Sequence, residues 1–220
     1  MMSRAFAARC ADARRLAVFL VAGSTLSAAI TPAAFAEMIG PADTNPANVE
    51  SGAYSIEPSH TQVLFSVSHM GFSTYYGQLS KVSGSMNLDA KAPSRSSFEI
   101  HVPVNSISTT SSTLNTELKS NAWLDAKANP EMVFKSTTIL PTGNGYADIT
   151  GNLTLHGVTR PIVLKAKLVG AGINPLDKKY TVGFDLNGTI MRSHFGITTY
   201  VPLIGDAVTV TIAGVFEKQG

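Results

Sequence analysis

Serine, histidine and arginine are the side chains of this sequence whose types and spacing could do chemistry. Three Ser-His pairs occur, at Ser59-His60, Ser68-His69 and Ser193-His194. Neighbouring residues in a strand point to opposite faces, so none of these pairs can form a hydrogen-bonded nucleophile and base. The sequence has neither a Gly-x-Ser-x-Gly elbow nor a phosphate-binding glycine loop. We therefore predict no catalytic residue.

Metal-ligand spacing is also poor. His60, His69 and His194 could converge in space, but no His-x-His or His-x-x-x-His pattern occurs, and the one cysteine, Cys10, lies near the N-terminus. The acidic residues are scattered rather than paired. We predict no metal and no other cofactor.

Arg192 is expected to be a buried cation, because it follows a segment with the two-residue period of a half-buried strand. The apolar residues of this segment are Tyr180, Val182, Phe184, Leu186 and Ile190. If the strand keeps its register, Arg192 and His194 point inward too, as His69 does at the end of another strand. A buried cation needs a partner, supplied either by the protein or by a ligand.

Two interpretations of these three residues stay open. His69, Arg192 and His194 could bind a phosphate or a quinone oxygen at the mouth of a cavity, with Arg192 forming bidentate hydrogen bonds. They could instead form an internal network that holds loops to the rest of the fold.

The elements that must position these residues are mostly strands. From Tyr54 onward, alternation of apolar and polar residues predicts about eight antiparallel segments. One long bent strand is expected over 75–88, turns at 142–145 and 156–157, and a connection that includes 170–172 and 174–178. Ser112 or Thr113 is expected to cap one short helix. The pattern favours a closed antiparallel eight-stranded β-barrel, with the helix packed against it, over a sandwich.

The N-terminal residues have the pattern of a cleaved export signal. Four arginines, an apolar stretch from Leu16 to Ile30 and Ala34-Phe35-Ala36 follow one another. We divide the chain into a signal peptide (1–36), a flexible leader (37–52) and a β-domain (53–220). Cleavage would leave 13 basic and 14 acidic residues of the 17 and 15 in the whole chain. With no basic cluster left, nucleic acid is not an expected partner.

Several ordered blocks of the sequence resemble the YceI-like family of exported, lipocalin-like proteins over residues 54–218. The blocks cover residues 59–72, 118–125, 129–136, 151–161, 192–196 and 205–206. The resemblance implies a lipocalin-like barrel that holds a long isoprenoid chain in a tunnel. It therefore implies a periplasmic carrier of a quinone or polyprenyl phosphate that performs no chemistry. Many relatives have an Arg-Asp pair and a histidine in the short helix, whereas this chain has Leu114, Asn115 and Glu117, so a headgroup role for the helix is not expected here.

Ten inward-facing apolar side chains are expected to line such a channel. They are Val63, Phe65, Val67, Phe134, Leu153, Leu164, Phe184, Leu186, Ile190 and Val210. The alternative is that they fill a solid core, as in most small barrels. His69, Arg192 and His194 are then the candidates for the polar end of the channel.

Two other functions stay open. One is a periplasmic stress-response enzyme that acts on a lipophilic substrate; the other is a dimeric interaction module with an empty core. Transient membrane contact and a homodimer are compatible with the carrier function. The apolar loop over 199–205, which contains Tyr200 and Leu203, is expected to be a mobile lid, with a dimer contact as the alternative.

Overall fold

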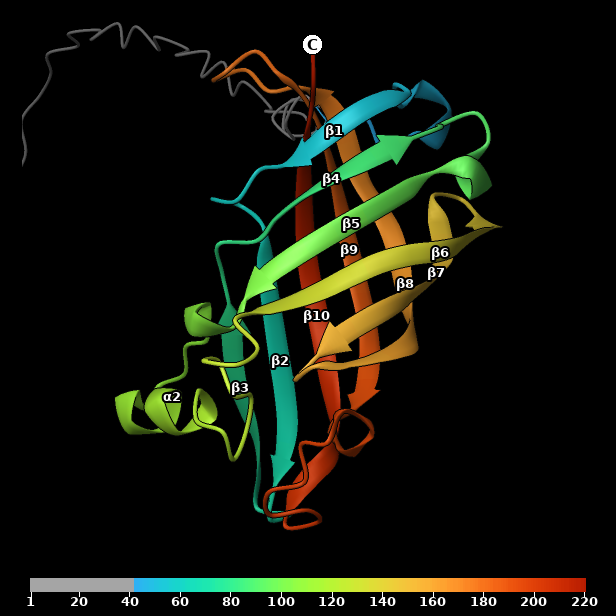
Figure 1. Ribbon diagram of the computed structural model, residues 1–220. Helices are drawn as coiled ribbons and strands as arrows, with labels where there is room; N and C mark the ends of the chain where they lie inside the picture. The colour runs from blue at the N-terminus through green and yellow to red at the C-terminus, as the bar shows by residue number, and fades with distance from the viewer. Residues whose placement is uncertain (1–41) are drawn as a thin grey trace, which may run out of the picture. The chain divides into compact units, whose positions relative to one another are not determined.

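The computed structural model describes residues 42–220, so the expected signal peptide and residues 37–41 of the expected leader lie outside the described residues. Ten strands make up most of the fold (Figure 1). They are β1 (Gly52–Ile56), β2 (Gln62–His69), β3 (Ser73–Leu79), β4 (Ser83–Leu88), β5 (Ser97–Pro103), β6 (Glu131–Gly143), β7 (Tyr146–Leu155), β8 (Val158–Ile173), β9 (Tyr180–Met191) and β10 (Ile204–Lys218). The helices are α2 (Ser112–Leu118) and four short 3₁₀ helices, η1 (Pro46–Asn48), η2 (Pro93–Arg95), η3 (Val104–Ser106) and η4 (Arg192–Phe195).

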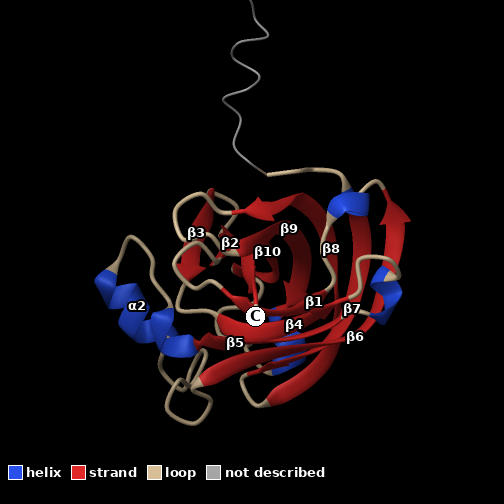
Figure 2. Cartoon of the chain, turned by 90° about the horizontal axis from the view of Figure 1, so that it is seen from above, coloured by secondary structure: helices blue, strands red, loops and turns tan. Residues whose placement is uncertain are grey.

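Eight of these strands close into an antiparallel ring. The order is β1-β4-β5-β6-β7-β8-β9-β10, and β1 pairs back with β10. The β2–β3 hairpin continues along the same edge of β10, because residues 204–213 of β10 pair with β2 and residues 216–218 pair with β1. In a view along the barrel, α2 lies outside the ring of strands (Figure 2). The predicted closed eight-stranded barrel with one helix is confirmed.

The strand expected over 75–88 is instead two strands. β3 ends at Leu79 and β4 begins at Ser83, and Lys81 between them has a φ of 58°. The break lets β3 pair with β2 while β4 pairs with β1 and β5. Gly84 then lies so close to β5 that a Cβ there would be 2.3 Å from the Glu99 carbonyl oxygen. A residue without a side chain is required at this crossing.

The two short hairpins were predicted correctly. Asn144-Gly145 and His156-Gly157 all have positive φ, as a two-residue hairpin turn with the twist of the strands requires. The connection after β8 is shorter than expected, because β8 continues to Ile173. Residues 170–172, expected in the connection, therefore lie within β8, next to a register shift between Leu168 and Gly170.

The helix α2 is where the sequence predicts it, with its cap one residue earlier than expected. The Ser111 hydroxyl, rather than that of Ser112 or Thr113, accepts a hydrogen bond from the Leu114 amide at 3.2 Å. Asn115 Oδ1 accepts from the Thr109 amide at 2.7 Å. The side chain of Leu118 packs against the main apolar cluster of the barrel.

The described part of the expected leader lies against the barrel. The Asp43 amide donates to the Ala171 carbonyl at 2.7 Å, and the Ala171 amide donates back at 2.8 Å. The Glu50 amide donates to the Tyr180 hydroxyl at 3.1 Å. Residues 42–51 therefore form a short bridge to β8 beyond the end of β7, and Val49 packs against a buried apolar cluster of the barrel, although the sequence shows no strand periodicity there.

Candidate binding cavity

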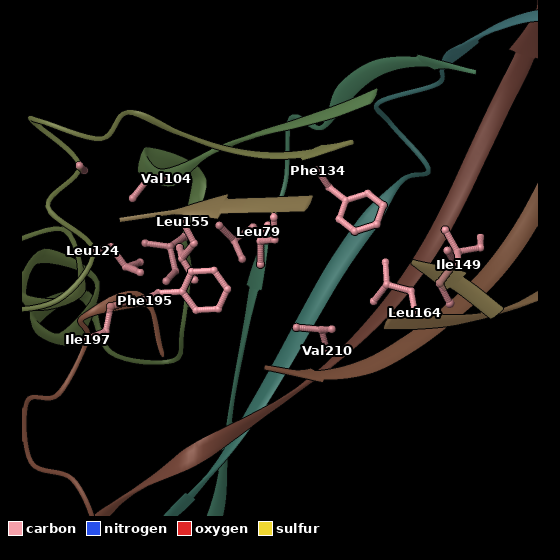
Figure 3. Close-up of a cluster of buried hydrophobic side chains, with 14 of the residues drawn as sticks. Leu79, Val104, Leu124, Phe134, Ile149, Leu155, Leu164, Phe195, Ile197 and Val210 are labelled. Carbon is pink, nitrogen blue, oxygen red and sulfur yellow. The ribbon is translucent and has the colours of Figure 1, made fainter. Parts of the chain in front are cut away.

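The barrel interior contains two adjoining apolar cavities. The first, called here the barrel cavity, has a volume of about 210 Å³ and lies among the strands of the closed ring. The second, called the helix-side cavity, has a volume of about 140 Å³ and is lined partly by Leu118 and Trp123. The residues that line both are Leu79, Met132, Leu155, Ile190 and Val210. In Figure 3, Leu79 and Val210 lie between Leu164 on one side and Leu124 on the other.

All ten apolar residues predicted for the channel line these cavities. Val63, Phe134, Leu153, Leu164, Phe184 and Leu186 line the barrel cavity, Phe65 and Val67 line the helix-side cavity, and Ile190 and Val210 line both. Strand alternation was enough to find them, because inward side chains occupy every second position. Their contact with a ligand stays a prediction.

Other lining residues lie where alternation carries no signal. Pro93 and Ser96, in and just after η2, contribute to the barrel cavity. Trp123, Leu124 and Ile197 come from irregular segments and line the helix-side cavity. A loop has no regular period, so its sequence does not indicate which side chains turn inward. The large apolar side chains at 123 and 124 were the available signal.

The polar side chains of the barrel cavity already have partners. The Thr61 hydroxyl donates to the Val215 carbonyl at 3.2 Å and accepts from the Val215 amide at 3.0 Å. The Ser96 hydroxyl accepts from the Asp89 amide at 2.9 Å. The lining is otherwise apolar, and it contains no titratable side chain. This cavity therefore suits a hydrocarbon chain better than a polar group.

Arg192 is buried at the wall of the helix-side cavity, with its hydrogen bonds directed to the protein. Its Nε donates to the Gly205 carbonyl at 2.9 Å, and its two terminal nitrogens donate to the Ile197 and Ile204 carbonyls at 3.0 and 2.8 Å. The guanidinium lies 5.3 Å from the centre of the Trp123 ring. These contacts match the internal network that the sequence analysis left open. A headgroup role for Arg192 stays a prediction.

Asp206 completes this network. Its two carboxylate oxygens accept hydrogen bonds from the Ser193 amide at 2.8 Å and from the Ser193 hydroxyl at 2.7 Å. These bonds, together with the positive charge of Arg192, hold the pKa of Asp206 below its usual value. Burial lowers the pKa of Arg192, and the Asp206 carboxylate opposes that change. The network fixes the start of η4 against the first residues of β10.

The two histidines predicted beside Arg192 do not line either cavity. His194 is exposed, so the expectation that it points inward is wrong. The reason is that β9 ends at Met191 and η4 follows, and in a 3₁₀ helix the buried positions are three residues apart, here Arg192 and Phe195. His69 is half-buried at the end of β2, with its ring 6.3 Å from that of Tyr75.

Within residues 42–220, no group of three His, Cys, Asp or Glu side chains could hold a metal ion. In the same part of the chain, no helix is both long and apolar enough to cross a membrane.

Comparisons with known proteins agree with this architecture. The family model of the YceI-like domain matches residues 54–216. A UPF0312 protein of Pectobacterium carotovorum is 37% identical over 164 residues, which cover 74% of this chain and 84% of the relative. Among solved structures, BcnA of Burkholderia cenocepacia superposes with a TM-score of 0.66 at 22% identity, covering 73% of this chain and 98% of that one.

A polyisoprenoid binding domain from Saccharophagus degradans shares the fold at a TM-score of 0.56 and 13% identity, covering 77% of this chain and all of that one. The family match spans most of the closed barrel and both strands of the β2–β3 hairpin. This chain therefore belongs to the YceI-like family.

Proposed function

We propose that the protein binds one isoprenoid lipid by its apolar tail inside the barrel and carries it in the periplasm. The observation that carries this proposal is the pair of adjoining cavities, which share five lining residues and have almost entirely apolar walls. The structural relative that binds polyisoprenoids supports the same class of ligand. The signal-like residues 1–36 support export.

The size of the cavities argues against a solid core. Protein interiors are packed with few voids larger than a water molecule. An engineered apolar cavity of roughly 150 Å³ in another protein stays dry and binds benzene. The barrel cavity alone is larger, at about 210 Å³. An empty space of this kind would gain favourable contacts by taking up hydrocarbon.

Recognition of such a ligand would depend on its tail. Each buried methylene contributes roughly 0.8 kcal/mol, so tail length can dominate the binding free energy. The barrel cavity has no unpaired polar side chain to hold a headgroup, because Thr61 and Ser96 are already hydrogen-bonded to the backbone. We therefore place the headgroup of the bound lipid outside the barrel cavity, at the helix-side end or in solvent.

We also propose that the protein performs no reaction on its ligand. Neither cavity is lined by a nucleophile free of backbone hydrogen bonds, and the one charged residue at their walls, Arg192, donates to three backbone carbonyls. A general acid or base must reach the proton it transfers. The cavities therefore favour a carrier over the alternative of a stress-response enzyme.

Tryptophan fluorescence can test this function directly. Trp123 is the one tryptophan of the sequence and lines the helix-side cavity, so its emission should report occupancy. The lipid-free protein would be titrated with prenyl alcohols of increasing length, and then with a quinone and a phosphate that carry the same tail. We expect a saturable change at one ligand per chain. Each added isoprene unit should lower Kd at least about tenfold until the cavities are full.

The headgroup series is the control. Exchanging alcohol, quinone and phosphate on one tail should change Kd less than removing one isoprene unit does. A Kd that follows the headgroup and ignores the tail would contradict tail recognition. No saturable change with any tail would contradict lipid binding in these cavities.

A further inference from the structure

Four large apolar side chains are exposed on two turns at one end of the barrel. Met70 and Phe72 belong to the turn between β2 and β3, and Tyr200 and Leu203 belong to the loop between η4 and β10. Their exposed fractions are 48%, 88%, 60% and 60%. These residues, carried on segments 70–74 and 196–203, are called here the apolar tip. Apolar groups gathered in this way on a surface mark an interaction site.

Backbone hydrogen bonds join the two segments to each other. The Met70 amide donates to the Leu203 carbonyl at 2.8 Å, and Ile204 pairs with His69. Within each segment a further bond closes the turn: the Phe72 amide donates to the His69 carbonyl at 3.0 Å, and the Ile204 amide donates to the Tyr200 carbonyl at 2.8 Å. The loop expected to be a lid is thus hydrogen-bonded to the end of β2, and its Tyr200 and Leu203 side chains are exposed.

The apolar tip lies next to the helix-side cavity. Val67, Ile197 and Ile204 line that cavity and stand within a few residues of the tip. The Tyr200 ring also lies 6.2 Å from that of Trp123, another lining residue. In Figure 1, the ends of β2 and β3 and the loop that leads into β10 lie together at the lower end of the barrel.

The composition of the tip is uncharged and apolar. Segments 70–74 and 196–203 contain no Asp, Glu, Lys or Arg. Phenylalanine, tyrosine, leucine and methionine on an uncharged surface suit the boundary between headgroups and acyl chains of a bilayer. A stable contact with a second copy would bury about 800 Å² on each partner. Four side chains on two short turns make too small a surface for that.

We propose that the apolar tip inserts into the surface of a lipid bilayer, which places the helix-side cavity next to the membrane. Insertion depends on apolar contact alone, so neither anionic lipid nor low salt is required. The passage of a lipid between the bilayer and the cavity rests in addition on the proposed function, whereas docking of the tip does not.

Flotation with phosphatidylcholine vesicles tests the docking. The wild-type protein is expected to float with the vesicles at low and at high salt. A double variant, Phe72→Ser with Leu203→Ser, is expected to lose at least about tenfold in bound fraction, because the burial of two large apolar side chains in the bilayer is lost. Leu176→Ser is the matched control: Leu176 is 91% exposed, in the turn before β9 at the opposite end of that strand from η4, and should leave flotation unchanged.

Three results would overturn the proposal. They are a wild-type protein that does not float, a double variant that floats as well as wild type, and flotation that needs anionic lipid and disappears in salt. A double variant that turns a dimer into a monomer without a change in flotation would identify a second copy as the partner instead.

Docking and lipid binding can fail separately. A wild-type protein that binds prenyl alcohol from ethanol solution and does not float contradicts the docking alone. A protein that floats through its tip and binds no prenyl chain supports the docking and contradicts the proposed function.

Discussion

Arg192 lies buried where β9 gives way to η4, and its guanidinium donates to the carbonyls of Ile197, Ile204 and Gly205. The sequence indicated that this side chain points inward, because it continues the alternation of β9. It could not indicate the partners, since backbone carbonyls of an irregular loop leave no mark in the sequence. The exposure of His194 was missed because the alternation was extended past Met191. The strand ends there, and in the 3₁₀ helix that follows His194 points outward.

The first prediction concerns Arg192→Lys. Lysine keeps the positive charge but cannot reach three carbonyls with a planar fork, so some buried carbonyls lose their donors. We expect the free energy of unfolding to fall by roughly 2–4 kcal/mol in chemical denaturation. Arg160→Lys is the control, because Arg160 is exposed and makes one long contact of 3.4 Å. Equal losses in the two variants would show that the buried network does not stabilise the fold.

The second prediction concerns pH. The folded-state pKa of Asp206 lies below its ordinary value of 3.8, mainly because Ser193 donates two hydrogen bonds to the carboxylate. A depressed pKa stabilises the fold above the ordinary pKa, and that contribution disappears as pH falls through the folded value. The gap in unfolding free energy between wild type and Asp206→Asn should therefore be constant near neutral pH and narrow below pH 3.8.

Unfolding by denaturant between pH 3 and pH 7 would measure this gap. Asp185→Asn, at an exposed position of β9, is the control and should change the unfolding free energy by less than about 0.5 kcal/mol. A gap between wild type and Asp206→Asn that widens in acid would contradict the assigned direction of the pKa shift.

At the scale of elements, alternation predicted most strands and the two short hairpins, because inward and outward positions of a barrel strand differ in polarity. The break between β3 and β4 was missed. The break depends on a positive φ at Lys81, and a lysine in the sequence gives no indication of that backbone conformation. The partner of the leader at β8 was also missed, because a short β-bridge consists of backbone hydrogen bonds.

The third prediction tests close packing between two strands. A Cβ at Gly151 of β7 would be 2.2 Å from the Phe134 ring and 2.6 Å from the Lys135 carbonyl oxygen on β6. Gly151→Ala should therefore cost roughly 1–3 kcal/mol of unfolding free energy, as overpacked sites do. Gly183→Ala on β9 is the control, because its nearest neighbour would be 3.8 Å away. Thermal melting of both variants would check this prediction. A Gly151→Ala variant with the melting temperature of wild type would contradict the tight β6–β7 contact.

At the scale of the whole molecule, the sequence could identify which side chains face inward but not whether they fill the interior. A barrel with a packed interior and a hollow barrel show the same alternation of apolar and polar residues. Polarity determines which side chains point inward, whereas their summed volume determines whether they fill the interior. The resemblance to the YceI-like family favoured a channel, and the structure contains two adjoining apolar cavities of about 210 and 140 Å³.

The fourth prediction distinguishes a hollow barrel from a packed one. Val210 lines both cavities, so the phenyl ring introduced by Val210→Phe can extend into cavity space. We expect this variant to lose less than about 1 kcal/mol in unfolding free energy, where a packed core would lose roughly 1–3 kcal/mol. It should also weaken lipid binding, because the ring occupies the junction of the cavities. Thr209→Phe, outward on the same strand, should leave lipid binding unchanged.

The central claim is tested most directly by native mass spectrometry of the protein purified gently from its native cells. Organic extraction then identifies whatever is bound. We predict one isoprenoid lipid per chain in wild type and in Thr209→Phe, and a reduced occupied fraction in Val210→Phe. The lipid should leave with its mass unchanged after incubation, as expected for a carrier. An empty wild-type protein that also takes up no prenyl chain in titration, or a lipid retained equally by Val210→Phe, would contradict tail binding in the barrel.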